Sequence, residues 1–167
     1  MALQLQAVLL SMEETLRINS KRKKMTKVMV IWAHSPEESA PCEYIGLLEL
    51  KRTFGTKFIV IDPRYTETVA NLADMWLPIR PGTDAALALG WINLIIEGEL
   101  YEREFVENWC YGFDKLKERA KEYPLEEVSR ISGLEVEKIA EVERLYATTK
   151  PAYIAWGLKT DMQGRNT

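Results

Sequence analysis

The chain has 167 residues, of which 47% are hydrophobic and 28% charged, as in an ordinary soluble globular domain. Its formal net charge of −3 provides no broad basic field, so we expect no nucleic-acid partner. One histidine and two cysteines are too few for a zinc or iron–sulfur motif, and Cys42 and Cys110 are predicted to be buried thiols rather than a disulfide. Without an apolar stretch of membrane-spanning length or a secretory signal, the chain is expected to be cytoplasmic.

The first 26 residues form a unit of their own in this prediction, followed by an α/β module over residues 27–167. An amphipathic helix is predicted for residues 3–18 from five apolar side chains at helical spacing, which are Leu5, Val8, Leu9, Met12 and Leu16. A basic connector, Lys21–Lys24, follows it. The apolar face of the helix either folds back over its own domain or packs against a second copy, and we favour a homo-oligomer.

Four short apolar runs predict the strands of a parallel sheet, and the first two are expected to be buried on both faces. They are Lys27–Trp32, Phe58–Ile61, Met75–Ile79 and Ala152–Trp156. Pro78 marks the third run as a short strand or an edge strand, because proline has no N–H for the ladder.

Helical segments separate these strands. The first is predicted to begin near Pro41, to bury Ile45 and Leu48, and to end at Gly55. Further helices are predicted over Thr66–Leu72, from a cap at Thr83 to about Ile96, and in pieces between Glu102 and Ala147 with starts after Pro124 and near Gly133. The alternation of strands and helices predicts an α/β fold: a doubly wound, mostly parallel, Rossmann-like sheet with helices on both faces.

Three polar loops follow the first three strands, and ligands bind at the carboxyl ends of strands in open parallel sheets. The loops are His34–Ser39, Asp62–Thr68 and Arg80–Asp84. Asp62 stands where doubly wound folds place an acid that accepts hydrogen bonds from ribose hydroxyls, although Asp-Pro is also a common turn opener. The sequence has no GxGxxG motif and no P-loop, which disfavours an ordinary NAD-dependent dehydrogenase.

The third loop opens a helix, and the free N–H groups there favour an anion. Asp84 is either a helix-start carboxylate or an acceptor for the adjacent N1–H and N2–H donors of guanine. Adenine presents an acceptor at N1, a mismatch of roughly 1–3 kcal/mol. Arg64, Thr68 and Arg80 are candidates for phosphate contacts.

At these loops the sequence resembles the molybdopterin oxidoreductase superfamily of the dimethyl-sulfoxide-reductase and formate-dehydrogenase type. Ile31–Ser39 is similar to its WGxNPxES segment, Ile59–Thr68 to IVIDPRxTET, and Leu77–Leu89 to LPIRPGTDAALAL. Asn93–Trp109 and Tyr146–Thr167 are similar to later segments, so the resemblance covers residues 27–167.

The resemblance implies an α/β domain that holds one of two molybdopterin guanine dinucleotides on a molybdenum or tungsten ion. It implies cofactor contacts at Ser35, Glu38 and Ser39 in the first loop, at Asp62 and Arg64 in the second, and at Pro81, Gly82 and Asp84 at the guanosine end. Two positions depart from the family pattern, because Ala33 stands where glycine is usual and Ser35 where asparagine is usual. A Cβ at position 33 is expected to crowd the cofactor, and the alternative is that the isolated chain binds none.

The resemblance also implies redox chemistry in the parent protein, with this module supplying binding and orientation. The family's iron–sulfur cysteines and metal ligand precede the matched region, and its members continue for hundreds of residues beyond it. We therefore expect a piece of a larger enzyme, catalytically inactive when isolated, whose partners are the remaining domains or subunits. The alternative is a stand-alone or degenerate nucleotide-binding module without redox activity.

Overall fold

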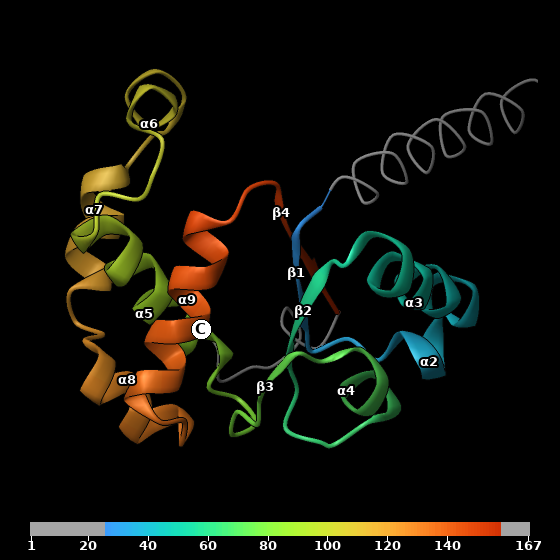
Figure 1. Ribbon diagram of the computed structural model, residues 1–167. Coiled ribbons are helices and arrows are strands. Elements are labelled where there is room, and N and C mark those ends of the chain that lie inside the picture. The colour runs from blue at the N-terminus through green and yellow to red at the C-terminus, as the bar shows by residue number, and fades with distance from the viewer. Residues whose placement is uncertain (1–25, 158–167) are drawn as a thin grey trace, which may run out of the picture.

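A computed structural model describes residues 26–157, which form a four-stranded parallel sheet between two layers of helices (Figure 1). The strands are β1 (Val28–Trp32), β2 (Lys57–Ile61), β3 (Met75–Leu77) and β4 (Ala152–Trp156), in the order β3-β2-β1-β4. One layer contains α2 (Pro36–Ser39), α3 (Pro41–Phe54) and α4 (Glu67–Leu72), and the other contains α5 (Asp84–Glu97), α6 (Arg103–Trp109), α7 (Phe113–Ala120), α8 (Leu125–Ser132) and α9 (Val136–Thr148). The predicted α/β fold is confirmed.

The strand register brings the carboxyl ends level with one another. Trp32, the last residue of β1, pairs with Ile61 of β2 on one side and with Trp156 of β4 on the other. Ile61 in turn pairs with Leu77, the last residue of β3. The loops that follow β1, β2 and β3 therefore leave from the same edge of the sheet.

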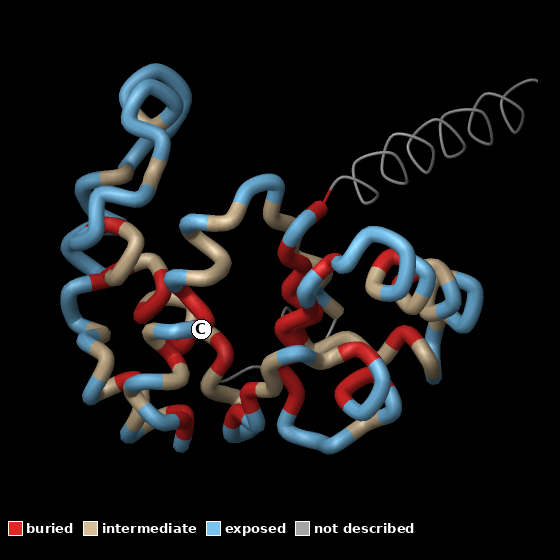
Figure 2. The backbone as a smooth tube through the Cα atoms, in the orientation of Figure 1, coloured by how far each residue is buried: buried red, intermediate tan, exposed pale blue. Residues whose placement is uncertain are grey.

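Alternate residues of β1 and β2 face opposite helix layers, and all of β1 is buried (Figure 2). Val30 and Ile59 pack with residues of α5, α8 and α9, whereas Met29 and Phe58 pack with residues of α3 and α4. Each fully buried side chain of this kind contributes roughly 1.5–3 kcal/mol of hydrophobic free energy. Burial on both faces explains why these strands appear in the sequence as unbroken apolar runs.

Helix α3 begins at Pro41 as predicted, but the prediction that Ile45 is buried is wrong. Its side chain is 66% exposed, while Leu47 and Leu50 are buried and Leu48 packs partly against the same cluster. Residues three apart share a helix face, and docking on β1 and β2 selects the face of Leu47 and Leu50.

The prediction of buried cysteines is also wrong, since Cys42 and Cys110 are both free and exposed. Cys42 lies in the first turn of α3, and Cys110 follows α6, a helix without buried residues. Strand β3 lies at one edge of the sheet, as Pro78 predicted, and ends at Leu77, two residues earlier than expected. Proline cannot donate to the neighbouring strand, so the ladder stops before it.

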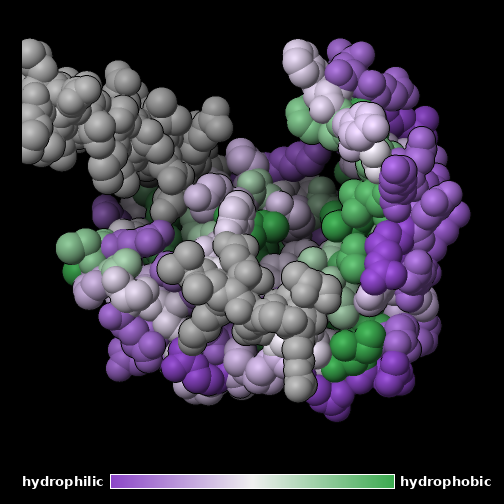
Figure 3. Space-filling model, turned by 180° about the vertical axis from the view of Figure 1, so that it is seen from behind, coloured by the Kyte–Doolittle hydropathy of each residue, from purple (hydrophilic) through white to green (hydrophobic). Residues whose placement is uncertain are grey.

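Helix α6 and the turn after it extend from the helical layer (Figure 1) and expose large apolar side chains. Phe105 is 57% exposed, Trp109 79% and Tyr111 fully. Seen from behind, the outer rim of the layer formed by α5–α9 is hydrophilic, and hydrophobic residues gather inside that rim (Figure 3).

None of the helices described within residues 26–157 has both the length and the apolar character of a membrane span. The predicted N-terminal helix and connector lie outside the described residues.

Candidate functional site

The loops after β1, β2 and β3 meet at the carboxyl edge of the sheet, as predicted. A hydrogen bond of 3.2 Å from Arg64 Nη2 to Ser35 Oγ joins the second loop to the first. A hydrogen bond of 2.7 Å from Trp32 Nε1 to Asp84 Oδ1 joins the end of β1 to the start of α5. The first bond ties two of the loops together, and the second ties a buried strand end to the helix that follows the third loop.

Arg64 lies at the centre of the first two loops. Asp62, only 4% exposed, accepts a 2.8 Å hydrogen bond from the Arg64 backbone N–H, and its Oδ1 lies 3.6 Å from Arg64 Nε. Glu38 Oε2 lies 3.7 Å from Arg64 Nη2. The pair with Glu38 is largely exposed and contributes about 0–1 kcal/mol at most. Its effect is to orient the Arg64 side chain, which is 49% exposed and can still donate to an anion.

Glu37 and Thr68 form a second link between the same loops. Thr68 is fully buried, and its hydroxyl donates to Glu37 Oε2. Glu37 Oε1 is buried without a hydrogen-bond partner among the residues that the structure describes. An unsatisfied buried acceptor costs roughly 1–3 kcal/mol, so a ligand N–H or O–H placed here would restore a lost interaction.

Thr68 was predicted to contact a phosphate, whereas in the structure its hydroxyl donates to Glu37. No role was predicted for Glu37 from the sequence. The sequence places Glu37 in the loop after a buried strand, which is too common a feature to identify a site.

Asp84 is 7% exposed and begins α5. Gly82, with φ of +80°, turns the chain into this helix in a conformation that glycine adopts without strain, and Pro81 before it is exposed. Thr83 occupies the capping position, but its hydroxyl donates to the Arg80 carbonyl at 2.7 Å and caps no N–H of the helix. The first N–H groups of α5 therefore have no side-chain acceptor from the cap.

Arg80 does not join the cluster around Arg64. Its Nη1 donates to the carbonyls of Arg130 and Ile131, at 2.8 and 3.3 Å, in the last turn of α8. Cations are favoured at helix C-termini because the last carbonyls lack helical partners. The structure thus gives Arg80 a role in holding α8, where the sequence analysis proposed a phosphate contact.

Ser39 and Ala33 shape the backbone of the first loop. The Ser39 hydroxyl donates to the Ser35 carbonyl at 3.0 Å. Ala33 has φ of +49°, a left-handed conformation that is unfavourable for residues with a Cβ. This conformation gives a backbone reason for glycine at this position, in addition to the crowding expected from the sequence. Gly157 packs closely against the same turn. A Cβ at position 157 would lie only 2.1 Å from the Ala33 oxygen, so there is no room for a side chain there.

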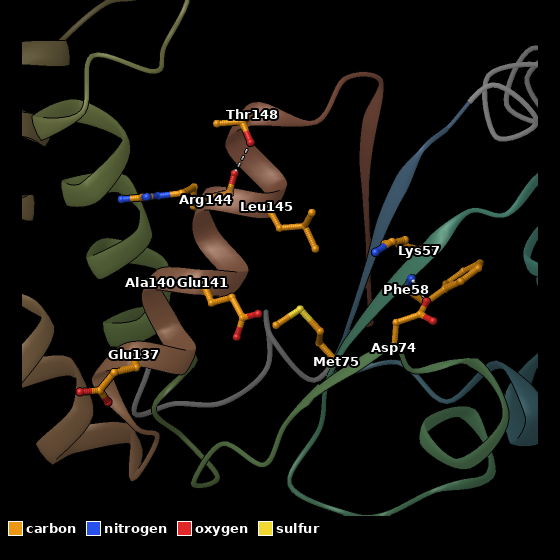
Figure 4. Close-up of a pocket in the computed structure, with 10 residues that line it drawn as sticks. All are labelled: Lys57, Phe58, Asp74, Met75, Glu137, Ala140, Glu141, Arg144, Leu145 and Thr148. Atoms are coloured by element: carbon orange, nitrogen blue, oxygen red, sulfur yellow. Dashed lines mark hydrogen bonds between the residues drawn. The ribbon is translucent and has the colours of Figure 1, made fainter.

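A hollow of about 760 Å³ lies elsewhere, between α9 and the beginnings of β2 and β3 (Figure 4). Lys57 and Met75, which begin these strands, line it with Glu141 and Leu145 of α9. This is the end of the sheet opposite the three loops. Parallel sheets bind ligands at the carboxyl ends of their strands, so we place the candidate site at the loops. Within residues 26–157 no group of three or more His, Cys, Asp and Glu side chains could hold a metal ion.

One family model and several known proteins match the chain. The family model described as molybdopterin oxidoreductase matches residues 11–166. The chain is 56% identical to acetylene hydratase of Syntrophotalea acetylenica over 68% of its own length and 15% of the relative's. It is 34% identical to formate dehydrogenase H of Escherichia coli K12 over 80% of its length, and 32% identical to dimethyl sulfoxide reductase of that organism over 83%.

The solved structure of acetylene hydratase from Pelobacter acetylenicus superposes with a TM-score of 0.76 and 44% sequence identity. The match covers 84% of this chain and 19% of that one. The chain therefore spans a fifth or less of the length of these relatives.

Proposed function

The chain belongs to the molybdopterin oxidoreductase family, and we propose that it binds the guanosine and phosphate end of one molybdopterin guanine dinucleotide. The observation that carries this proposal is the common place of three side chains: Asp62 and Arg64 follow β2, and Asp84 follows β3, at the same carboxyl end of the parallel sheet. When bound, the cofactor with its molybdenum or tungsten ion supplies the redox chemistry of the parent enzyme. The residues of this chain bind and orient it.

The residues at the carboxyl edge fit such a ligand in charge and in hydrogen-bonding capacity. A phosphate suits the half-exposed guanidinium of Arg64 and the uncapped first turn of α5. A guanine edge suits the Asp84 carboxylate, since it offers two N–H donors to an acceptor-only group. Glu37 Oε1, buried without a described partner, provides a further acceptor for a ligand N–H or O–H.

We assign roles to the remaining predicted residues on the same basis. Asp62 holds the Arg64 backbone and is the candidate for the ribose hydroxyls, Ser35 and Glu38 orient the Arg64 side chain, and Ser39 stabilises the first loop. Pro81 and Gly82 set the path of the chain into α5, where they lie beside the guanosine contact at Asp84. Thr68 acts through Glu37.

The reaction of the parent protein has two candidates. We propose redox chemistry, since formate dehydrogenase H and dimethyl sulfoxide reductase are among the relatives. The second candidate is hydration, which is favoured by 56% identity to an acetylene hydratase. Viologen-linked turnover by the purified parent enzyme would support the first, and conversion of acetylene to acetaldehyde without a dye would support the second.

The isolated chain is proposed to be catalytically inactive, because it spans only a fifth or less of its relatives. Its partners are the remaining parts of the parent protein, and the apolar side chains exposed on α6 are a candidate contact surface. Turnover of a viologen dye by the purified, metal-loaded chain would overturn the proposed inactivity.

Calorimetric titration of the 167-residue chain with GDP and with ADP tests the nucleotide site. We expect GDP to bind more tightly by about tenfold or more, which corresponds to about 1.4 kcal/mol. The Asp84→Ala variant should lose this preference, whereas Glu141→Ala at the opposite end of the sheet should keep it. Equal or absent binding of both nucleotides by the unaltered chain would contradict the proposed function and favour a degenerate nucleotide-binding module.

A further inference from the structure

The one side-chain hydrogen bond that joins β1 to α5 runs from Trp32 to Asp84, among the residues that the structure describes. The donor and the acceptor atoms are 2.7 Å apart, and both residues are only 7% exposed. A hydrogen bond to a charged group at such a site stabilises more than one between neutral groups, because little water competes for the carboxylate. The bond spans 52 positions of the chain, so no local sequence motif predicts it.

The Trp32 side chain is buried in the core that β1 forms with α5 and α9. The Trp32 backbone pairs with β2 and β4, and its ring packs edge-on against Trp91 with centroids 5.4 Å apart. Trp91 in turn stacks on Tyr146 of α9 at 5.9 Å. The donor that meets Asp84 therefore has little freedom to follow the carboxylate if the latter rotates.

A carboxylate has about four acceptor positions on its two oxygens. Trp32 uses one of them on Oδ1, which leaves enough for the two parallel N–H donors of guanine. The indole bond restricts the rotation of the carboxylate plane, and without it the group can turn more freely about its terminal torsion. Two parallel hydrogen bonds need a fixed plane, whereas a single contact does not.

We propose that Trp32 is a specificity-determining residue that positions the Asp84 carboxylate to select guanine over adenine. This inference rests on the proposed nucleotide site and adds a residue that the sequence analysis treated as part of a strand. Trp32 need not contact the nucleotide, because it acts through Asp84. Its removal changes the ratio of the guanine and adenine affinities more than it changes adenine binding itself.

The test compares two tryptophan-to-phenylalanine variants of the full chain, Trp32→Phe and Trp91→Phe. Both remove an indole from the same buried aromatic cluster, but Trp91 Nε1 has no hydrogen-bond partner among the described residues, so only the first variant removes a bond to Asp84. Thermal melts and near-ultraviolet circular dichroism establish that each variant folds. Titration with GDP and ADP then gives the affinity ratio of each.

We expect Trp32→Phe to lower the preference for GDP over ADP by about tenfold and Trp91→Phe to leave it within about twofold, in line with one charge-assisted hydrogen bond. A role of Trp32 in packing alone would weaken both nucleotides equally and leave the ratio unchanged, which would overturn the inference. An equal loss of the ratio in both variants would overturn it too. If the unaltered chain binds neither nucleotide, the proposed function fails and this inference fails with it.

A second measurement does not depend on any ligand. The chain has five tryptophans, so the Trp32 indole signal is identified as the one missing from the nitrogen–proton spectrum of Trp32→Phe. We expect its N–H to exchange with solvent much more slowly than those of the exposed Trp109 and Trp156, and to exchange faster in Asp84→Ala. Exchange as fast as at the exposed tryptophans in the unaltered chain would remove the contact on which the inference depends.

Discussion

Replacing Gly90 by alanine is expected to destabilise the chain, although alanine is the better helix former. Gly90 lies in α5, where it faces α8. A Cβ on Gly90 would lie 2.6 Å from Val128 Cγ2 and 3.4 Å from two further atoms of the same side chain. Val128 is fully buried, so it has no free space into which it can move.

The expected magnitude follows from two opposed effects. Alanine in place of glycine within a helix gains about 0.5–1 kcal/mol, and overpacking of a filled core costs about 1–3 kcal/mol. Because the contact at 2.6 Å is far inside van der Waals distance, the cost exceeds the gain. We expect Gly90→Ala to lower the free energy of unfolding by about 1–2 kcal/mol, as measured by urea denaturation.

Gly46 in α3 provides the matched control, because a Cβ there would meet nothing within 4 Å. Gly46→Ala should raise the free energy of unfolding by about 0.5–1 kcal/mol. The double variant Gly90→Ala with Val128→Ala should be more stable than the sum of the single changes by at least about 1 kcal/mol, because the clash is then removed. If both glycine variants stabilise the chain equally, α5 and α8 do not pack as closely as described.

Three further changes test the backbone, the charges and the site. Ala33→Gly should raise the free energy of unfolding by about 0.5–1 kcal/mol in urea denaturation, because φ of +49° strains alanine; an unchanged value would contradict the left-handed turn. Burial raises the pKa of Glu143, so the folded state favours its protonated form, and stability is lost as pH rises from the unfolded pKa through the folded one. Glu143→Gln should therefore melt higher than the unaltered chain at pH 8 and alike at pH 4, and equal melting at both would refute this. Arg64→Ala should weaken GDP binding about tenfold and reduce its salt dependence, whereas a loss that salt does not change would argue against a phosphate contact.

Much of the architecture could be predicted from the sequence because its causes are local or periodic. The run at β1 is apolar throughout, as is β2 after Lys57, and such short runs are typical of strands buried on both faces. Pro41 and Gly55 bound α3 because proline lacks the N–H that a first turn does not need, and glycine accepts the left-handed end at φ of +64°. Parallel strands then bring their following loops to one end of the sheet, so the place of the candidate site could be predicted from the element order.

The tertiary structure alone decided which side chains meet. From the sequence, Asp84 was predicted to be either a helix-start carboxylate or an acceptor for guanine. Its hydrogen bond to Trp32 could not be predicted, because the two residues are 52 positions apart and meet only through the packing of α5 on the sheet. Packing between distant elements also determines that Thr68 donates to Glu37 and that Arg80 donates to the last carbonyls of α8. It likewise determines that Ile45 and both cysteines are exposed. Periodicity determines that a helix has an apolar face, whereas the rotation of that face and the partners of each polar atom are set by contacts between distant elements.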